Sequence, residues 1–70
     1  MTVSVKNVTF PAEAYVLNNG GGWQYNSSIK FVAPPQVGQE VAIDENTVLD
    51  IVRVRHVVYE KKSYMEIYLK

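Results

Sequence analysis

Three features of the chain carry groups that enzymes and metal sites use. His56 is the only histidine, glycines occupy positions 20–22, and Asp44, Glu45 and Asp50 are acidic residues close together in sequence. A catalytic histidine needs a nucleophile or an orienting carboxylate, and the chain has no Gly-x-Ser-x-Gly motif. A phosphate-binding glycine loop leads into a helix or is followed by Lys and Ser/Thr, whereas a strand pattern follows this one. The acidic residues lack the spacing of an EF-hand loop and its closing glutamate.

We therefore expect a structural role for each of the three. His56 should pack on the inward face of a sheet with a hydrogen-bonded ring, and the glycine run should form a plain hairpin loop. The acidic residues should form a solvated turn. The sequence accordingly predicts a protein that is not an enzyme, has no cofactor and holds no metal ion.

Size and composition narrow the function classes further. The 70 residues suffice for a single β domain over 1–70, and without cysteine the chain has no disulfide and no thiolate metal site. Apolar residues make up 47% of the chain, which is enough for a compact core and unlike a disordered segment. Seven basic and seven acidic residues give zero net charge. That balance disfavours nonspecific nucleic-acid binding and leaves little repulsion against a homodimer.

The N-terminal residues do not show the pattern of a targeting segment. They lack a basic region followed by an apolar run, and no apolar run in the chain approaches the ~20 residues of a membrane span. We expect a cytoplasmic protein that makes no membrane contact.

The periodic segments predict a chain built almost wholly of β-strands, because Val, Ile, Thr, Tyr and Phe dominate them. A bulge near residues 6–7 would bring the apolar side chains of the first strand onto one face. Residues 12–17 continue that strand or form a short second one. The expected strands cover residues 2–10, 23–33, 40–43, 47–59 and 64–70.

The Asn and Gly residues at 18–22 predict a hairpin in which Leu17 lies opposite Trp23 and Tyr15 lies opposite Tyr25. The odd-numbered residues from 23 to 33 are mostly apolar, so a regular strand would place them on one face. This pattern favours packing of Trp23 and Tyr25 in the core over a role as exposed anchors for a protein partner.

The last two expected strands form a hairpin. A four-residue loop at 60–63 is favoured over a two-residue loop, because two lysines suit a type I′ turn poorly, and it places Tyr59 opposite Tyr64. One face then gathers Val54, His56, Val58, Met65, Ile67 and Leu69. The other face gathers a basic and aromatic set, with Val57 and Glu66 among it: Arg53, Arg55, Tyr59, Tyr64, Tyr68 and Lys70.

Five strands with short connections and one apolar face predict an all-β fold. The expected architecture is a small five-stranded antiparallel sheet or a partly open SH3-like or OB-like barrel. A single sheet would leave its apolar face in water, so it must close on itself or dimerise.

Two segments of the C-terminal half resemble a pattern in short, mostly uncharacterised bacterial and phage β proteins. They are PQVGQEV at 35–41 and VRHVV at 54–58, and the resemblance covers residues 34–69. In those proteins a Pro-x-x-Gly turn leads into a short strand and then into a long hairpin that carries a histidine. The resemblance implies a small SH3-like β-barrel or sheet protein, and it assigns no functional residue.

Two functions fit these patterns. The favoured one is a non-enzymatic protein-interaction or accessory module, in a phage or bacterial setting, whose partner is another protein or a second copy of the chain. The alternative is a single-stranded nucleic-acid-binding module, in which the basic and aromatic face of the last hairpin stacks bases and contacts phosphates. Glu66 stands in the middle of that face and would repel phosphate, which favours the protein partner.

Overall fold

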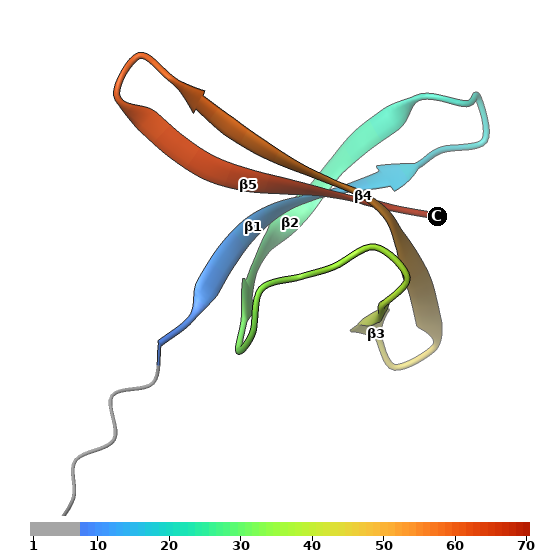
Figure 1. The fold of residues 1–70 in the computed structure, drawn as a ribbon. Coiled ribbons are helices and arrows are strands. Elements are labelled where there is room, and N and C mark those ends of the chain that lie inside the picture. Colours follow the sequence, from blue (N-terminus) through green and yellow to red (C-terminus); the bar gives the residue numbers. More distant parts are fainter. Residues whose placement is uncertain (1–7) are drawn as a thin grey trace, which may run out of the picture.

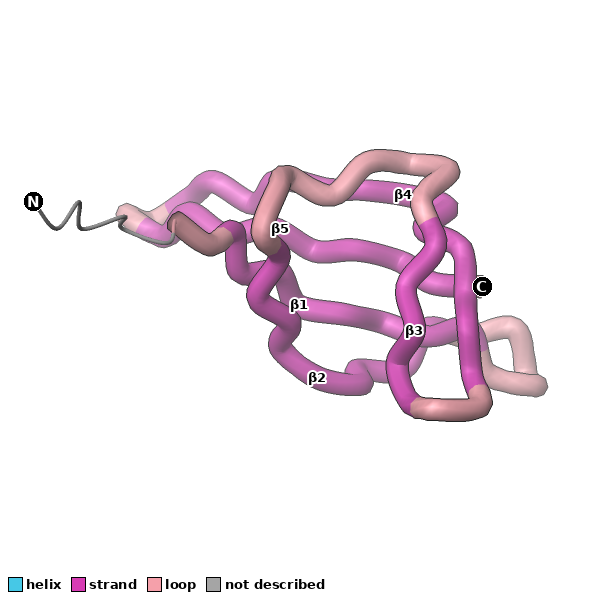
Figure 2. The backbone as a smooth tube through the Cα atoms, turned by 90° about the horizontal axis from the view of Figure 1, so that it is seen from below, coloured by secondary structure: helices cyan, strands magenta, loops and turns pink. Residues whose placement is uncertain are grey.

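The computed structural model describes residues 8–70, which form five strands and no helix. The sheet order is β2-β1-β5-β4-β3, and Figures 1 and 2 show it curling into a half-barrel. The predicted all-β, barrel-like fold is confirmed. The strands are β1 (Phe10–Leu17), β2 (Trp23–Phe31), β3 (Glu40–Asp44), β4 (Thr47–Tyr59) and β5 (Lys62–Leu69).

The expectation of a wholly antiparallel sheet is wrong at one pair. β1 lies parallel to β5, while the other three pairs are antiparallel. Parallel neighbours need a long connection, and here the rest of the sheet supplies it because β2, β3 and β4 lie between them in sequence. Residues 1–7, which hold most of the predicted first strand and its bulge, lie outside the described residues.

The β1–β2 hairpin has the predicted register, with Leu17 opposite Trp23 and Tyr15 opposite Tyr25. Its loop is held by Asn18, whose Oδ1 accepts hydrogen bonds from the backbone N–H groups of Gly20 and Gly22, each at 3.0 Å. Gly21 has a φ of 84°, in the left-handed region that glycine adopts without strain. The glycine run is therefore a hairpin loop, as expected.

The predicted single face of β2 is wrong, because a bulge interrupts the strand. Ser27 lies opposite Ala14 and Tyr25 opposite Tyr15, so Asn26 has no opposite residue. The extra residue reverses the alternation of side chains. Ile29 consequently packs against the core, whereas Tyr25 turns to the other face and contacts Tyr15.

β4 is a long strand that pairs with two neighbouring strands. Its first part pairs with β3 and its second part with β5, and the register shifts at Val52, between Ile51 and Arg53. The segment before β3 also joins β4, because Gly38 N–H donates to the Ile51 carbonyl at 2.9 Å. This irregularity accompanies the bend that carries the β3–β4 hairpin out of the plane of the other strands (Figure 1).

The predicted register of the last hairpin is wrong by two residues. Glu60 and Lys61 form a two-residue turn with φ values of 51° and 64°, which places Tyr59 opposite Lys62. Positive φ at both positions is the type I′ geometry, whose twist matches that of the flanking strands. A shift of two keeps each side chain on its predicted face but changes its partner, so His56 lies opposite Met65 instead of Ile67.

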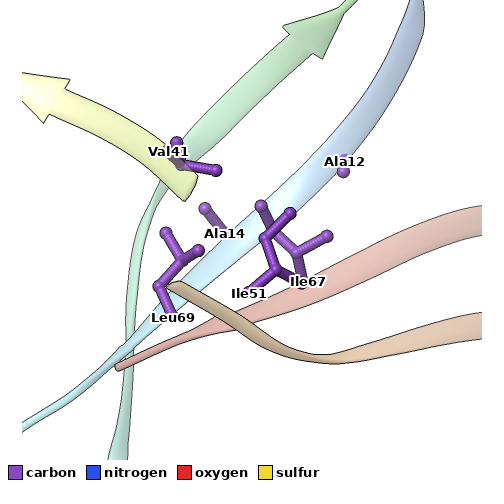
Figure 3. Packing of buried hydrophobic residues seen from close by; sticks show 6 residues of the cluster. All are labelled: Ala12, Ala14, Val41, Ile51, Ile67 and Leu69. Carbon is purple, nitrogen blue, oxygen red and sulfur yellow. The ribbon is translucent and has the colours of Figure 1, made fainter. Parts of the chain in front are cut away.

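The core occupies the inner face of the curled sheet. Ile67 and Leu69 are buried as predicted, and Val54 and Met65 are partly buried against the core. Val58, which was predicted to be buried with them, is 72% exposed. The hairpin extends beyond β1, whose pairing with β5 begins only at Met65, so no other strand within residues 8–70 flanks its tip. Figure 3 shows the buried cluster: Ala12, Ala14, Val41, Ile51, Ile67 and Leu69.

Candidate functional site

The outer face of the sheet carries a cluster drawn from four strands. Alternation and register place Tyr15 on β1 beside Tyr68 on β5, with Tyr25 and Arg53 as their partners on β2 and β4. The bulge at Asn26 brings in the aromatic residues of β2. We call this cluster the aromatic–arginine face, and it consists of Tyr15, Trp23, Tyr25, Arg53, Arg55, Tyr64, Glu66 and Tyr68.

Tyr68 lies at the centre of the aromatic–arginine face and is only 7% exposed. Its ring stacks on Tyr15 with centroids 5.4 Å apart, and the ring of Trp23 meets it edge-on at 5.1 Å. The guanidinium carbons of Arg53 and Arg55 lie 5.5 Å and 5.7 Å from its centroid. Aromatic pairs contribute about 0.5–1.5 kcal/mol each beyond their buried area, so these contacts hold the face in one arrangement.

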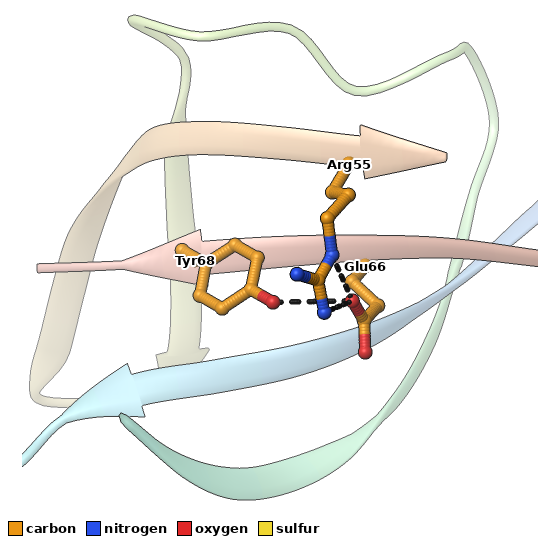
Figure 4. A network of polar contacts seen from close by, with 3 residues as sticks. All are labelled: Arg55, Glu66 and Tyr68. Atoms are coloured by element: carbon orange, nitrogen blue, oxygen red, sulfur yellow. Dashed lines mark hydrogen bonds and ion pairs between the residues drawn. The ribbon is translucent and has the colours of Figure 1, made fainter. Parts of the chain in front are cut away.

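Glu66 is the buried acceptor of this face and is only 4% exposed. Its Oε1 accepts a hydrogen bond from Arg55 Nε at 2.7 Å and one from the Tyr68 hydroxyl at 3.1 Å, and it forms an ion pair with Arg55 Nη2 (Figure 4). Burial alone would raise the pKa of Glu66, but the hydrogen bonds from Arg55 and Tyr68 outweigh it and hold that pKa below its usual value. Glu66 is therefore a carboxylate at neutral pH.

The tyrosines around Glu66 carry neutral hydroxyl groups at neutral pH. Burial, and then the hydrogen bond to Glu66, raise the pKa of Tyr68. Burial, and then the charge of Glu66, likewise raise the pKa of Tyr15 and of Tyr64. The face thus combines apolar rings, hydroxyl donors and guanidinium groups, which suits contact with another macromolecule.

The structure brings together four of the six predicted binding residues, Arg53, Arg55, Tyr64 and Tyr68. Tyr59 stands apart at the exposed end of the last hairpin, and Lys70 follows the end of β5. The sequence interpretation weighed Trp23 and Tyr25 as exposed anchors but favoured packing in the core, because it assumed a regular strand over residues 23–33, and that preference is wrong. The residue types at Asn26 and Ser27 do not by themselves identify a bulge.

The features first considered for chemistry lie elsewhere. His56 belongs to the inner face by alternation, but its predicted packing is wrong because the ring is exposed beyond the edge of the core. It borders a hollow of about 330 Å³ that Phe10, Ser63 and Met65 also line. Within residues 8–70, no three His, Cys, Asp or Glu side chains lie together as metal ligands do. No helix of the described chain is long and apolar enough to cross a membrane.

Comparison with protein-family models, with curated proteins and with solved structures found no match to this chain.

Proposed function

We propose that this chain is a non-enzymatic protein-binding module whose binding surface is the aromatic–arginine face. One observation carries the proposal: a bulge places the largest aromatic side chain, Trp23, outside with Tyr25, where they are 41% and 51% exposed. Trp, Tyr and Arg are the residue types enriched at the energetic centres of protein interfaces. The resemblance of residues 34–69 to short bacterial and phage β proteins supports an accessory role of this kind.

The internal contacts of the face suit it to binding. Arg55 is fixed by Glu66, and the ring of Tyr68 is held between Tyr15 and the two guanidinium groups. Side chains that are already ordered lose little conformational entropy when a partner docks. Trp23 and Tyr25 then offer their exposed edges on a rigid base.

The same contacts make nucleic acid the weaker candidate. Stacking of bases requires free ring faces, and the ring of Tyr68 is engaged by Tyr15 and by the guanidinium groups of Arg53 and Arg55. The Arg55 charge is compensated by the Glu66 carboxylate, so it is not available to a phosphate. The exposed ring of Tyr59 lies apart from these groups, at the tip of the last hairpin.

Quantitative capture from a lysate of the source cell, with matched variants, tests the proposal. The wild-type chain should enrich one set of proteins, and W23A/Y25A should lose that set. V32A/V37A truncates two exposed valines in the β2–β3 connection and should retain it. Equal capture by all three proteins would refute the binding role of the face, provided that circular dichroism shows all three folded.

Fluorescence anisotropy with labelled single-stranded DNA and RNA tests the alternative. We expect no binding that survives physiological salt. Binding at physiological salt that R53A and Y64A each abolish would replace the protein-binding proposal with the nucleic-acid one.

A further inference from the structure

The charges of this neutral chain are segregated along the sequence. Residues 32–52 contain four carboxylates and no Lys, Arg or His. Residues 53–70 contain five Lys or Arg residues and only two carboxylates. The fold converts this pattern into two surfaces, since the first segment supplies β3 and the first part of β4, and the second supplies the rest of β4 and β5.

The acidic surface is one face of the β3–β4 hairpin, and it holds an unusual pair. Glu40 lies directly opposite Asp50, and Ala42 lies opposite Val48 on the same exposed face. We call these four residues the acidic hairpin face. Like charges in directly opposite positions destabilise a sheet. A cation from a partner would remove that cost.

Among residues 8–70, no cationic side chain forms an ion pair with Glu40 or Asp50. The ion pair found among residues 8–70 is the one between Arg55 and Glu66. Lys70 exchanges two backbone hydrogen bonds with Asp50, but their side chains form no ion pair. On the other surface, Arg53 lies over Tyr68 without a carboxylate partner of its own. The acidic hairpin face therefore carries carboxylates without a cation, and the aromatic–arginine face carries a guanidinium group, that of Arg53, without a carboxylate.

We infer that the acidic hairpin face of one copy docks on the aromatic–arginine face of a second copy, with Glu40 and Asp50 beside Arg53 and with Val48 against the exposed aromatic edges. The inference rests on the proposed function, because it names the partner of the same face. Both surfaces belong to one sheet and cannot fold onto each other, so the contact must join two copies. The zero net charge of the chain leaves no long-range repulsion between them.

Sedimentation velocity over a concentration series tests the inference on the full chain. The wild-type sedimentation coefficient should rise with concentration at about 0.01 M salt, where the Debye length is about 30 Å, and far less at about 1 M, where it is about 3 Å. E40K/D50K should weaken association by about tenfold or more. E45K/E60K, which makes the same charge change in two turns, should associate like the wild type.

Mixing two defective variants provides the decisive arm. W23A/Y25A lacks the receiving face and E40K/D50K lacks the docking face, so neither should associate alone. In their equimolar mixture, W23A/Y25A supplies an intact acidic hairpin face and E40K/D50K supplies an intact aromatic–arginine face. The mixture should therefore form a 1:1 complex. A mixture that stays monomeric, or a wild type that stays monomeric at every concentration, would overturn the inference.

The outcomes separate this inference from the proposed function. A monomeric wild type that still captures a protein set through Trp23 and Tyr25 removes only the second copy as partner. Association that E40K/D50K abolishes and W23A/Y25A leaves intact would count against the aromatic–arginine face itself, and so against both proposals.

Discussion

Replacing Tyr68 with Phe removes one atom from the centre of the aromatic–arginine face and leaves its ring contacts in place. The lost group is the hydroxyl that donates to Glu66 at 3.1 Å between two buried residues. Hydrogen bonds to charged groups contribute about 1.5–3 kcal/mol. The Glu66 oxygen keeps its contacts with Arg55, so we expect the lower end, about 1.5 kcal/mol of unfolding free energy.

The deficit of Y68F should also depend on pH. The folded-state pKa of Glu66 lies below its unfolded value, so the stabilisation is complete above an unfolded pKa of about 4.3 and is lost as the pH falls through the folded pKa. A protonated Glu66 is a weaker acceptor. The difference between wild type and Y68F should therefore be constant at neutral pH and shrink in acid.

Urea denaturation at several pH values measures this difference. Trp23 is the only tryptophan and lies 5.1 Å from the Tyr68 ring, so its fluorescence reports on the cluster. Y64F is the matched control, because it makes the same change on the same strand and face at a half-exposed tyrosine with no hydrogen bond to Glu66. Equal losses in Y68F and Y64F, or a Y68F deficit that persists in acid, would refute the reasoning.

Three further predictions concern the scaffold and are measured by denaturant melts. I67A should lose about 2–5 kcal/mol because the side chain is fully buried, whereas V58A, on the same face but 72% exposed, should change stability by about 0.5 kcal/mol or less; equal losses would place the hairpin tip in the core. N18A should lose about 1–2 kcal/mol, because two backbone N–H groups of the glycine loop lose their acceptor; wild-type stability would mean that water replaces it. E60N/K61G should gain about 1 kcal/mol by relieving positive φ at two non-glycine residues, and a loss would contradict the two-residue turn.

Residue parity in the last hairpin could be predicted from the sequence, but the pairing could not. Two- and four-residue loops differ by two positions in register, which leaves every side chain on the same face. The alternation of Ile67 and Leu69 with Glu66 and Tyr68 therefore predicted both faces correctly. It paired Arg55 with Tyr68, whereas the two-residue turn places Arg55 opposite Glu66 and creates the ion pair.

Other features depend on tertiary contacts that leave no local pattern. Val58 has the periodicity of a buried residue. It is exposed because, within residues 8–70, the pairing of β1 with β5 begins only at Met65 and leaves the hairpin tip without a neighbouring strand. The parallel alignment of β1 with β5 joins segments from opposite ends of the described chain. The bulge at Asn26 follows from the register of both sides of the hairpin and not from the residue type.

That bulge is the step on which the candidate site depends. Without it, Trp23 and Tyr25 would share the inner face with Ile29 and Phe31 and would enlarge a core that now relies on Ala12 and other small or aliphatic side chains. A small domain has little apolar surface to bury, so leaving its only tryptophan 41% exposed forgoes core stability. Exposed large aromatics held in a fixed cluster are the informative exception to the burial of apolar residues. A partner that covers Trp23 and Tyr25 would offset this loss of core burial, and this is why we propose that the binding surface lies on the outer face.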